Sequence, residues 1–188
     1  MWQKNKTAQL SICGLLAALT ATGAFLKINI GHVPITLQTL FVYLSGSLLS
    51  PGFAASAQVT YLVCGLIGIP VFASGGGPAT ILLPTFGYLL GFPLASMTIA
   101  KILHINTRQV DKNKLTHPSW KIVLLANATG AGIIFTLGVL YLYVNLNFIT
   151  DNSISLKSAL WTGGIIFIPG EIVKVIIAAT IAKKLTVY

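Results

Sequence analysis

Long runs of apolar residues constrain this sequence more than any other feature. The stretches 7–26 and 122–146 contain no charged residue, and each is about as long as a helix that crosses a bilayer core. Over 188 residues, 55% are apolar and 8% are charged, whereas soluble domains carry about 25% charged residues. One soluble core of this size could not hide so much apolar surface. The sequence therefore predicts an all-α integral membrane protein.

Six segments are apolar and long enough to span the membrane. Their approximate bounds are 7–26, 33–49, 53–72, 81–103, 122–146 and 160–182. Ser50-Pro51-Gly52 separates the second span from the third, and the glycine-rich stretch 74–78 predicts a loop before the fourth. No polar stretch is long enough for a second domain. We expect residues 1–188 to form a single membrane domain of six helices.

The Lys and Arg residues are distributed unequally between the two sides. An even number of spans places both termini on one side, and positively charged loops favour the cytoplasm. With both termini inside, only Lys27 and Lys157 fall on the outer side, together with the glycine-rich loop. The cations on the cytoplasmic side are then Lys4, Lys6, Lys101, Arg108, Lys112, Lys114, Lys121, Lys183 and Lys184.

Several functions are disfavoured by what the sequence lacks. The net charge of +9 comes from cations at the ends of apolar runs, not from one basic stripe, so we expect no nucleic-acid partner. There is no P-loop for ATP and no His-Glu-x-x-His zinc motif. The acidic residues are Asp111, Asp151 and Glu171, and the first two lie in predicted loops. We predict no enzyme activity, no cofactor and no metal site.

The sixth span contains two charges, in the segment Phe-Ile-Pro-Gly-Glu-Ile-Val-Lys at 167–174. Lys174 lies about 14 Å along the helix from Lys183, farther than a lysine side chain reaches. Each charge at this depth costs about 2.5–3.5 kcal/mol, so Glu171 and Lys174 need partners or a wet cavity. A spacing of three places them on one helix face, where they can pair.

Pro169 and Gly170 predict a helix break directly before these charges. Such breaks at bilayer depth are typical of substrate sites. We expect Glu171 to accept N–H bonds from a small ligand, and Lys174 to neutralise a ligand carboxylate. The alternative is a buried ion pair that only braces the fold. Because such pairs are often no more stable than apolar replacements, we favour the ligand site.

The second span supplies a candidate opposite wall. Thr36, Gln38 and Thr39 are polar residues in an otherwise apolar helix, which suits either ligand contact or hydrogen bonds between helices. Phe41, Tyr88 and Asn127 are weaker candidates for the same wall. In the first span, small residues at helical spacing form a stripe that another helix, internal or from a partner subunit, could approach closely. This stripe consists of Gly14, Ala17, Ala18 and Ala21.

The motifs together resemble the BioY family over nearly the whole chain. They are Val-Pro-Ile-Thr-Leu-Gln-Thr (33–39), Gly-Ile-Pro-Val-Phe (68–72), the glycine-rich loop, Pro-Thr-Phe-Gly-Tyr-Leu-Leu-Gly-Phe (84–92) and the charged segment 167–174. BioY proteins are the biotin-capturing components, built from six membrane helices, of energy-coupling factor transporters. The resemblance implies a bundle of this type in a bacterial cytoplasmic membrane. It also implies biotin as ligand, a transmembrane coupling subunit, and separate subunits that hydrolyse ATP.

The resemblance also implies roles for individual residues. The acidic-x-x-Lys pair of the family falls on Glu171 and Lys174, and its polar second-span motif on Thr36 and Gln38. Its ligand-covering loop falls on 75–78, which includes Gly76 and Gly77. Its Gly-Tyr motif falls on 87–88 and ends at Tyr88, and its coupling face falls on Ala17 and Ala21. Family members commonly have Asp where Glu171 stands, and some have a basic residue where this chain has Leu89. This leaves Lys174 as the cation expected at membrane depth.

Three alternatives remain open at this stage. The chain could bind another small carboxylated vitamin, or it could move biotin without ATPase partners. It could also be a structural membrane protein in which Glu171 and Lys174 form an internal brace.

Overall fold

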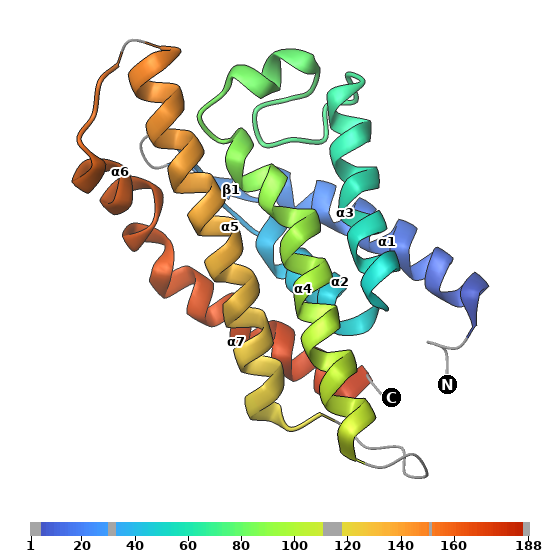
Figure 1. Ribbon diagram of the computed structural model, residues 1–188. Coiled ribbons are helices and arrows are strands. Elements are labelled where there is room, and N and C mark those ends of the chain that lie inside the picture. Colours follow the sequence, from blue (N-terminus) through green and yellow to red (C-terminus); the bar gives the residue numbers. More distant parts are fainter. Residues whose placement is uncertain (1–4, 30–32, 111–117, 151, 186–188) are drawn as a thin grey trace.

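The computed structural model describes residues 5–29, 33–110, 118–150 and 152–185, with only the backbone described for 107–110. These residues form a helical bundle (Figure 1). The α-helices are α1 (Lys6–Phe25), α2 (Gln38–Leu48), α3 (Pro51–Leu66), α4 (Phe86–Val110), α5 (Trp120–Phe148), α6 (Leu156–Gly163) and α7 (Ile168–Leu185). The structure also contains two 3-10 turns, η2 (Pro78–Leu82) and η3 (Ile165–Phe167). A short hairpin pairs β1 (Lys27–Ile28) with β2 (Ile35–Thr36).

Within the described residues, four helical stretches are long and apolar enough to cross a membrane. They are Lys6–Phe25, Phe86–Asn106, Trp120–Phe148 and Leu156–Leu185. Their outer surfaces expose large apolar side chains, including Leu10 at 63% and Phe148 at 75%, which only lipid can solvate favourably. Each of the six predicted spans contains a helix, and the prediction of an all-α membrane protein is confirmed.

The helices α2 and α3 are shorter than the spans predicted for them. They have 11 and 16 residues, which corresponds to about 16 Å and 24 Å of helix. The helix α2 contacts α1, α3, α4, α5 and α7, and most of its side chains are buried. A helix enclosed by other helices meets little lipid, so its length need not match the bilayer.

Several span boundaries differ from the prediction, and the local backbone explains the differences. The predicted second span began at residue 33, but residues 35–36 form β2 and pair with β1, so α2 begins only at Gln38. The predicted third span ran to residue 72, but α3 ends at Leu66, just before Gly68 in the left-handed region at φ 109°. The predicted fourth span began at residue 81, but α4 begins at Phe86, after Pro84.

The sixth predicted span is broken, but not where the sequence suggested. The chain leaves α6 at Gly163, passes through Gly164 and η3, and enters α7 at Ile168. Pro169 therefore lies in the first turn of α7, where a missing N–H breaks no intrahelical bond. The break precedes Pro169 instead of following it, and it places Glu171 in the first turn of α7.

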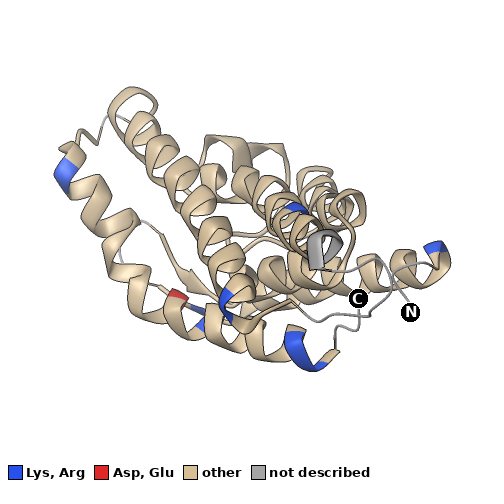
Figure 2. Cartoon of the chain, turned by 60° about the horizontal axis from the view of Figure 1, so that its bottom comes forward, with Lys and Arg blue, Asp and Glu red and all other residues tan. Residues whose placement is uncertain are grey.

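The arrangement of the ends is compatible with the predicted topology. In Figure 1 the start of α1 and the end of α7 lie toward one side of the bundle, and the glycine-rich loop lies at the opposite end. Figure 2 shows most cations near helix ends, with one red segment close to a blue one along α7. The orientation in the membrane remains a prediction. Lys4, Asp111, Lys112, Lys114, Asp151 and the side chain of Arg108 lie outside the described residues.

Candidate functional site

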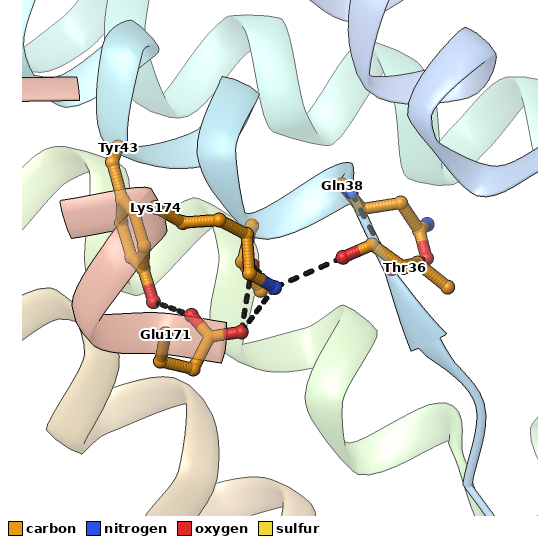
Figure 3. A network of polar contacts seen from close by, with 6 residues as sticks. Thr36, Gln38, Tyr43, Glu171 and Lys174 are labelled. Atoms are coloured by element: carbon orange, nitrogen blue, oxygen red, sulfur yellow. Dashed lines mark hydrogen bonds and ion pairs between the residues drawn. The ribbon is translucent and has the colours of Figure 1, made fainter. Parts of the chain in front are cut away.

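Glu171 is buried, and its carboxylate meets two side chains of α2. Thr39 donates its hydroxyl to Oε1 at 3.0 Å, and Tyr43 donates its hydroxyl to Oε2 at 2.5 Å. Figure 3 shows the Tyr43 hydroxyl directed at the Glu171 carboxylate. Hydrogen bonds to an ionised group are roughly twice as strong as neutral ones. The position of Glu171 in the first turn of α7 adds the favourable field of a helix N-terminus.

Lys174 lies one helical turn later and completes the network. Its Nζ forms an ion pair with Glu171 and donates to the backbone oxygen of Thr36 at 2.9 Å and to Thr39 Oγ1 at 2.7 Å. These contacts involve three acceptors, and an ammonium group has three N–H donors. Both charges are therefore compensated inside the bundle, in agreement with the prediction that they need partners.

A cavity of about 320 Å³ lies beside this pair. This volume falls within the usual range of small-molecule sites. The described lining runs from buried Glu171 and Lys174 to exposed Lys27 and Asn29, so the cavity reaches the surface near the hairpin. Aromatic rings form much of the remaining wall, namely Phe72, Tyr88, Phe92, Phe135 and Phe167. The cavity can thus hold a molecule with an apolar body and polar groups.

The polar residues predicted on the second span do line this cavity. The Thr36 hydroxyl donates to Gln38 Oε1 at 2.9 Å, and Gln38 Nε2 donates to the Tyr61 hydroxyl at 2.5 Å. These two hydrogen bonds therefore fix the side chains of Thr36 and Gln38. The Thr36–Gln38 segment lies at the junction of β2 and α2, where Figure 3 shows it facing the end of Lys174.

Tyr88 also lines the cavity, and glycine on the neighbouring helix makes room for it. A Cβ on Gly138 would lie 2.2 Å from Tyr88 Cδ1, so a side chain there would displace the ring. The Tyr88 hydroxyl donates to the backbone oxygen of Gly163 at 2.7 Å, at the break between α6 and α7. Its ring packs edge-on against Phe135, with centroids 5.8 Å apart. Tyr88 thus connects the cavity wall to this break.

Gly76 and Gly77 do not line the cavity, although their neighbours Ala73 and Ser74 do. The backbone explains why glycine stands at both positions. Gly77 has φ 103°, in the left-handed region, and a Cβ on Gly76 would lie 2.3 Å from the backbone oxygen of Ile69. These glycines shape the loop that borders the cavity.

Phe41 and Asn127 are not among the residues that line the cavity. Phe41 is half-buried and borders Gly23 of α1, where an added Cβ would lie 3.0 Å from its ring. Asn127 is fully buried in α5 and accepts a hydrogen bond from Ser47 at 3.1 Å. Its position fits the alternative of a hydrogen bond between helices.

Tyr43 and Lys27 are two polar neighbours of the site that the sequence did not single out. Tyr43 follows Thr39 by four residues, so the two lie on one face of α2, and this spacing was the available signal. Lys27 has the sequence context of an interfacial anchor, and only the hairpin places it beside the cavity.

The predicted small-residue stripe on α1 is partly exposed. Gly14 and Ala18 face outward, Ala21 is half-buried, and Ala17 is 7% exposed. Nothing lies within 4 Å of a Cβ built on Gly14. Part of the stripe therefore remains accessible to another helix.

A second and larger cavity is an apolar groove of about 800 Å³ between α5 and the α6–α7 segment. Its lining includes Leu125, Ala128, Leu160 and Ile172, and Glu171 borders it as well. Apolar side chains dominate this lining, unlike that of the first cavity. We call these two regions the polar cavity and the apolar groove.

The fold and the polar cavity define a class, the multi-pass helical membrane proteins that enclose a polar cavity within their bundle. The family described as "BioY family" matches residues 1–188, and the chain belongs to this family. The family resemblance stated from the sequence is confirmed.

Similar proteins agree with this assignment. The chain is 37% identical over 185 residues to a "Probable biotin transporter BioY" of Lysinibacillus sphaericus, covering 98% of this chain and 90% of the relative. It is 35% identical over 178 residues to a "Biotin transporter BioY" of Thermotoga maritima, covering 94% and 95%. These relatives are named as transporters, which agrees with the prediction that the chain is not an enzyme.

A solved structure resembles this one closely. It is the crystal structure of the S-component for biotin from an ECF-type ABC transporter, with a TM-score of 0.81 and 27% sequence identity. The match covers 98% of this chain and 94% of the other. The fold is therefore that of an S-component of this transporter type.

Proposed function

We propose that this chain captures biotin and mediates its uptake as the substrate-binding component of an ECF-type transporter. The observation that supports this most directly is the buried Glu171–Lys174 pair beside a cavity that reaches the surface. Relatives that are named as biotin transporters, and that match over 90% or more of their length, support biotin as the ligand. We assign the chain to a bacterial cytoplasmic membrane, with both termini on the cytoplasmic side.

The polar cavity suits the chemistry of biotin. An ionised carboxylate has about four acceptor positions, and Glu171 uses three of them on Thr39, Lys174 and Tyr43. The remaining position can accept an N–H from the cyclic urea of biotin. The aromatic wall offers an apolar surface for the sulfur-containing ring, and thioether sulfur packs favourably against aromatic rings.

Titration of the purified chain with biotin, desthiobiotin and an unrelated carboxylated vitamin tests this proposal. We expect biotin to bind most tightly, because its urea N–H and its bicyclic ring match the two kinds of wall. Equal affinity for the unrelated vitamin would contradict the biotin assignment. A chain that binds none of them would support the role of Glu171 and Lys174 as a structural brace.

We also propose that uptake depends on a transmembrane coupling subunit and on ATPase subunits. The exposed part of the α1 stripe, at Gly14 and Ala18, is the surface we assign to the coupling subunit. Replacing Ala18 with Leu should reduce biotin uptake at least fivefold in cells that hold all subunits. It should leave the affinity of the isolated chain unchanged, because Ala18 lies outside the polar cavity.

Two measurements separate this role from that of a stand-alone facilitator. Proteoliposomes that contain only this chain should bind biotin without accumulating it. Uptake by such vesicles, or unchanged uptake by the Ala18→Leu variant in cells, would contradict dependence on partners docked at this surface. The same change at the exposed Ala128, which is on α5 and outside the polar cavity, serves as the matched control.

A further inference from the structure

The polar cavity has a second cation, which the sequence placed at the membrane surface. Lys27 lies on β1, and its register partner across the hairpin is Thr36 on β2. Residues directly opposite each other in an antiparallel pair project from the same face, with Cβ atoms about 4.5–5.5 Å apart. Both residues line the polar cavity. The hairpin therefore holds the Lys27 side chain beside the cavity, at its exposed end.

The two lysines differ in how many of their donors are already occupied. Lys174 has three contacts, with Glu171, Thr39 and the backbone oxygen of Thr36, so all three N–H donors have acceptors. Lys27 donates to the backbone oxygen of Ala73 in the neighbouring loop. Among the described residues this is the one bonded acceptor, so two N–H donors of Lys27 are left for a ligand. A ligand carboxylate can thus bind Lys27 without breaking a contact of the buried pair.

The balance of charges in the cavity lining also favours a ligand carboxylate next to Lys27. Among the described residues that line the polar cavity, the charged ones are Lys27, Lys174 and Glu171. Lys174 and Glu171 neutralise each other within 4 Å, so the surplus positive charge of this lining belongs to Lys27. A monoanionic ligand completes the balance if its carboxylate lies next to Lys27. If the carboxylate were placed at Lys174, it would instead compete with Glu171 for the same ammonium group.

We propose that Lys27 recognises the carboxylate of the ligand at the exposed end of the polar cavity, while Glu171, held in place by Lys174, binds the opposite end of the molecule. This inference rests on the proposed function, since it assigns the two ends of biotin. The urea then faces Glu171, and the flexible acid chain extends toward the hairpin. The expectation that Lys174 neutralises the carboxylate is thereby replaced.

Calorimetric titration of the full-length chain with biotin and with biotin amide tests the assignment. The amide has the same rings and chain but no negative charge. Lys27→Met should weaken biotin binding about tenfold or more, the size expected for a hydrogen bond to a charged group, and change amide binding less than twofold. Lys27→Arg keeps the charge and should retain biotin affinity within about threefold. Lys157→Met, at an exposed lysine outside the cavity, is the matched control.

The outcomes distinguish this inference from the proposed function. If the unaltered chain binds neither biotin nor its amide, the proposed function fails. If biotin binds but Lys27→Met and Lys27→Arg leave its affinity unchanged, Lys27 does not contact the carboxylate. If Lys27→Met weakens both ligands equally, Lys27 only fastens the loop at Ala73, and the inference is overturned. Selective loss of biotin affinity with the amide unaffected supports it.

Discussion

The polar cavity and the apolar groove meet at Glu171, yet they differ in what they can recognise. The groove is the larger, at about 800 Å³ against about 320 Å³, and its lining is nearly all apolar. Hydrocarbon chains of lipid fill such a surface as well as any solute does, so the groove offers no selectivity for a polar molecule. The smaller cavity has the lysines and the Thr36–Gln38 segment. Polar partners, and not volume, therefore mark the cavity that we propose as the binding site.

Of the substitutions considered, loss of Lys174 should weaken ligand binding in the polar cavity the most. Lys174→Met leaves Glu171 with two hydrogen bonds and no cation, and an unpaired buried charge costs about 3–5 kcal/mol. Without its cation we expect the carboxylate to be held less firmly, so that it no longer presents a well-placed acceptor to the urea N–H. Biotin and biotin amide should both bind at least a hundredfold more weakly in calorimetric titration.

A double variant controls for folding in that experiment. Glu171→Gln combined with Lys174→Met removes both charges, so the bundle keeps no uncompensated ion. It should restore the thermal midpoint of the single variant without restoring biotin affinity. Recovery of affinity in the double variant would show that the pair only braces the helices.

Tyr43 should have a smaller effect, because it acts on the ligand through Glu171. Tyr43→Phe removes the hydroxyl that donates to Oε2 at 2.5 Å and leaves the ring in place. Without this bond the carboxylate is less firmly oriented, and we expect about a tenfold loss of biotin affinity. Thr20→Val, which removes a buried hydroxyl at a position that does not line the cavity, serves as the comparison. Equal effects of the two substitutions would argue against a positioning role for Tyr43.

Filling the apolar groove should change biotin affinity the least. Ala128→Leu adds an apolar side chain at an exposed position of the groove lining. Because this residue does not line the polar cavity, biotin affinity should stay within twofold of the unaltered chain. A loss of tenfold or more would place part of the ligand in the groove and would remove the distinction between the two regions.

The sequence predicted the centre of the proposed site because charged and polar side chains are energetically unfavourable at membrane depth. Glu171 and Lys174 could not be explained at membrane depth without partners, and Thr36 and Gln38 were conspicuous in an apolar segment. Tyr43 gave no comparable signal, since a tyrosine among apolar residues is ordinary in a membrane helix. Lys27 was interpreted from its place at the end of a span, where lysines commonly anchor helices. Only the pairing of β1 with β2 brings it to the cavity.

In the fold, too, features set by local sequence were predicted, whereas features set by packing were not. The six helical segments followed from their apolar length, and the family resemblance gave their arrangement. The break in the last span was placed at Pro169 and Gly170, because proline and glycine disfavour helix interiors. The structure puts the break at Gly163 and Gly164, since proline is well tolerated in the first turn of a helix. Which of two local signals ends a helix depends on packing that a single sequence does not reveal.

The spacing of Glu171 and Lys174 has a consequence for how the chain enters the membrane during synthesis. Both residues belong to one helix and lie one turn apart, so they can neutralise each other as soon as α7 is helical. The translocation machinery then meets a compact dipole instead of two separate ions, which lowers the cost of inserting the last segment. Thr36, Thr39 and Tyr43, made more than 120 residues earlier, receive this segment when it docks. The proposed binding site is therefore completed only when α7 docks.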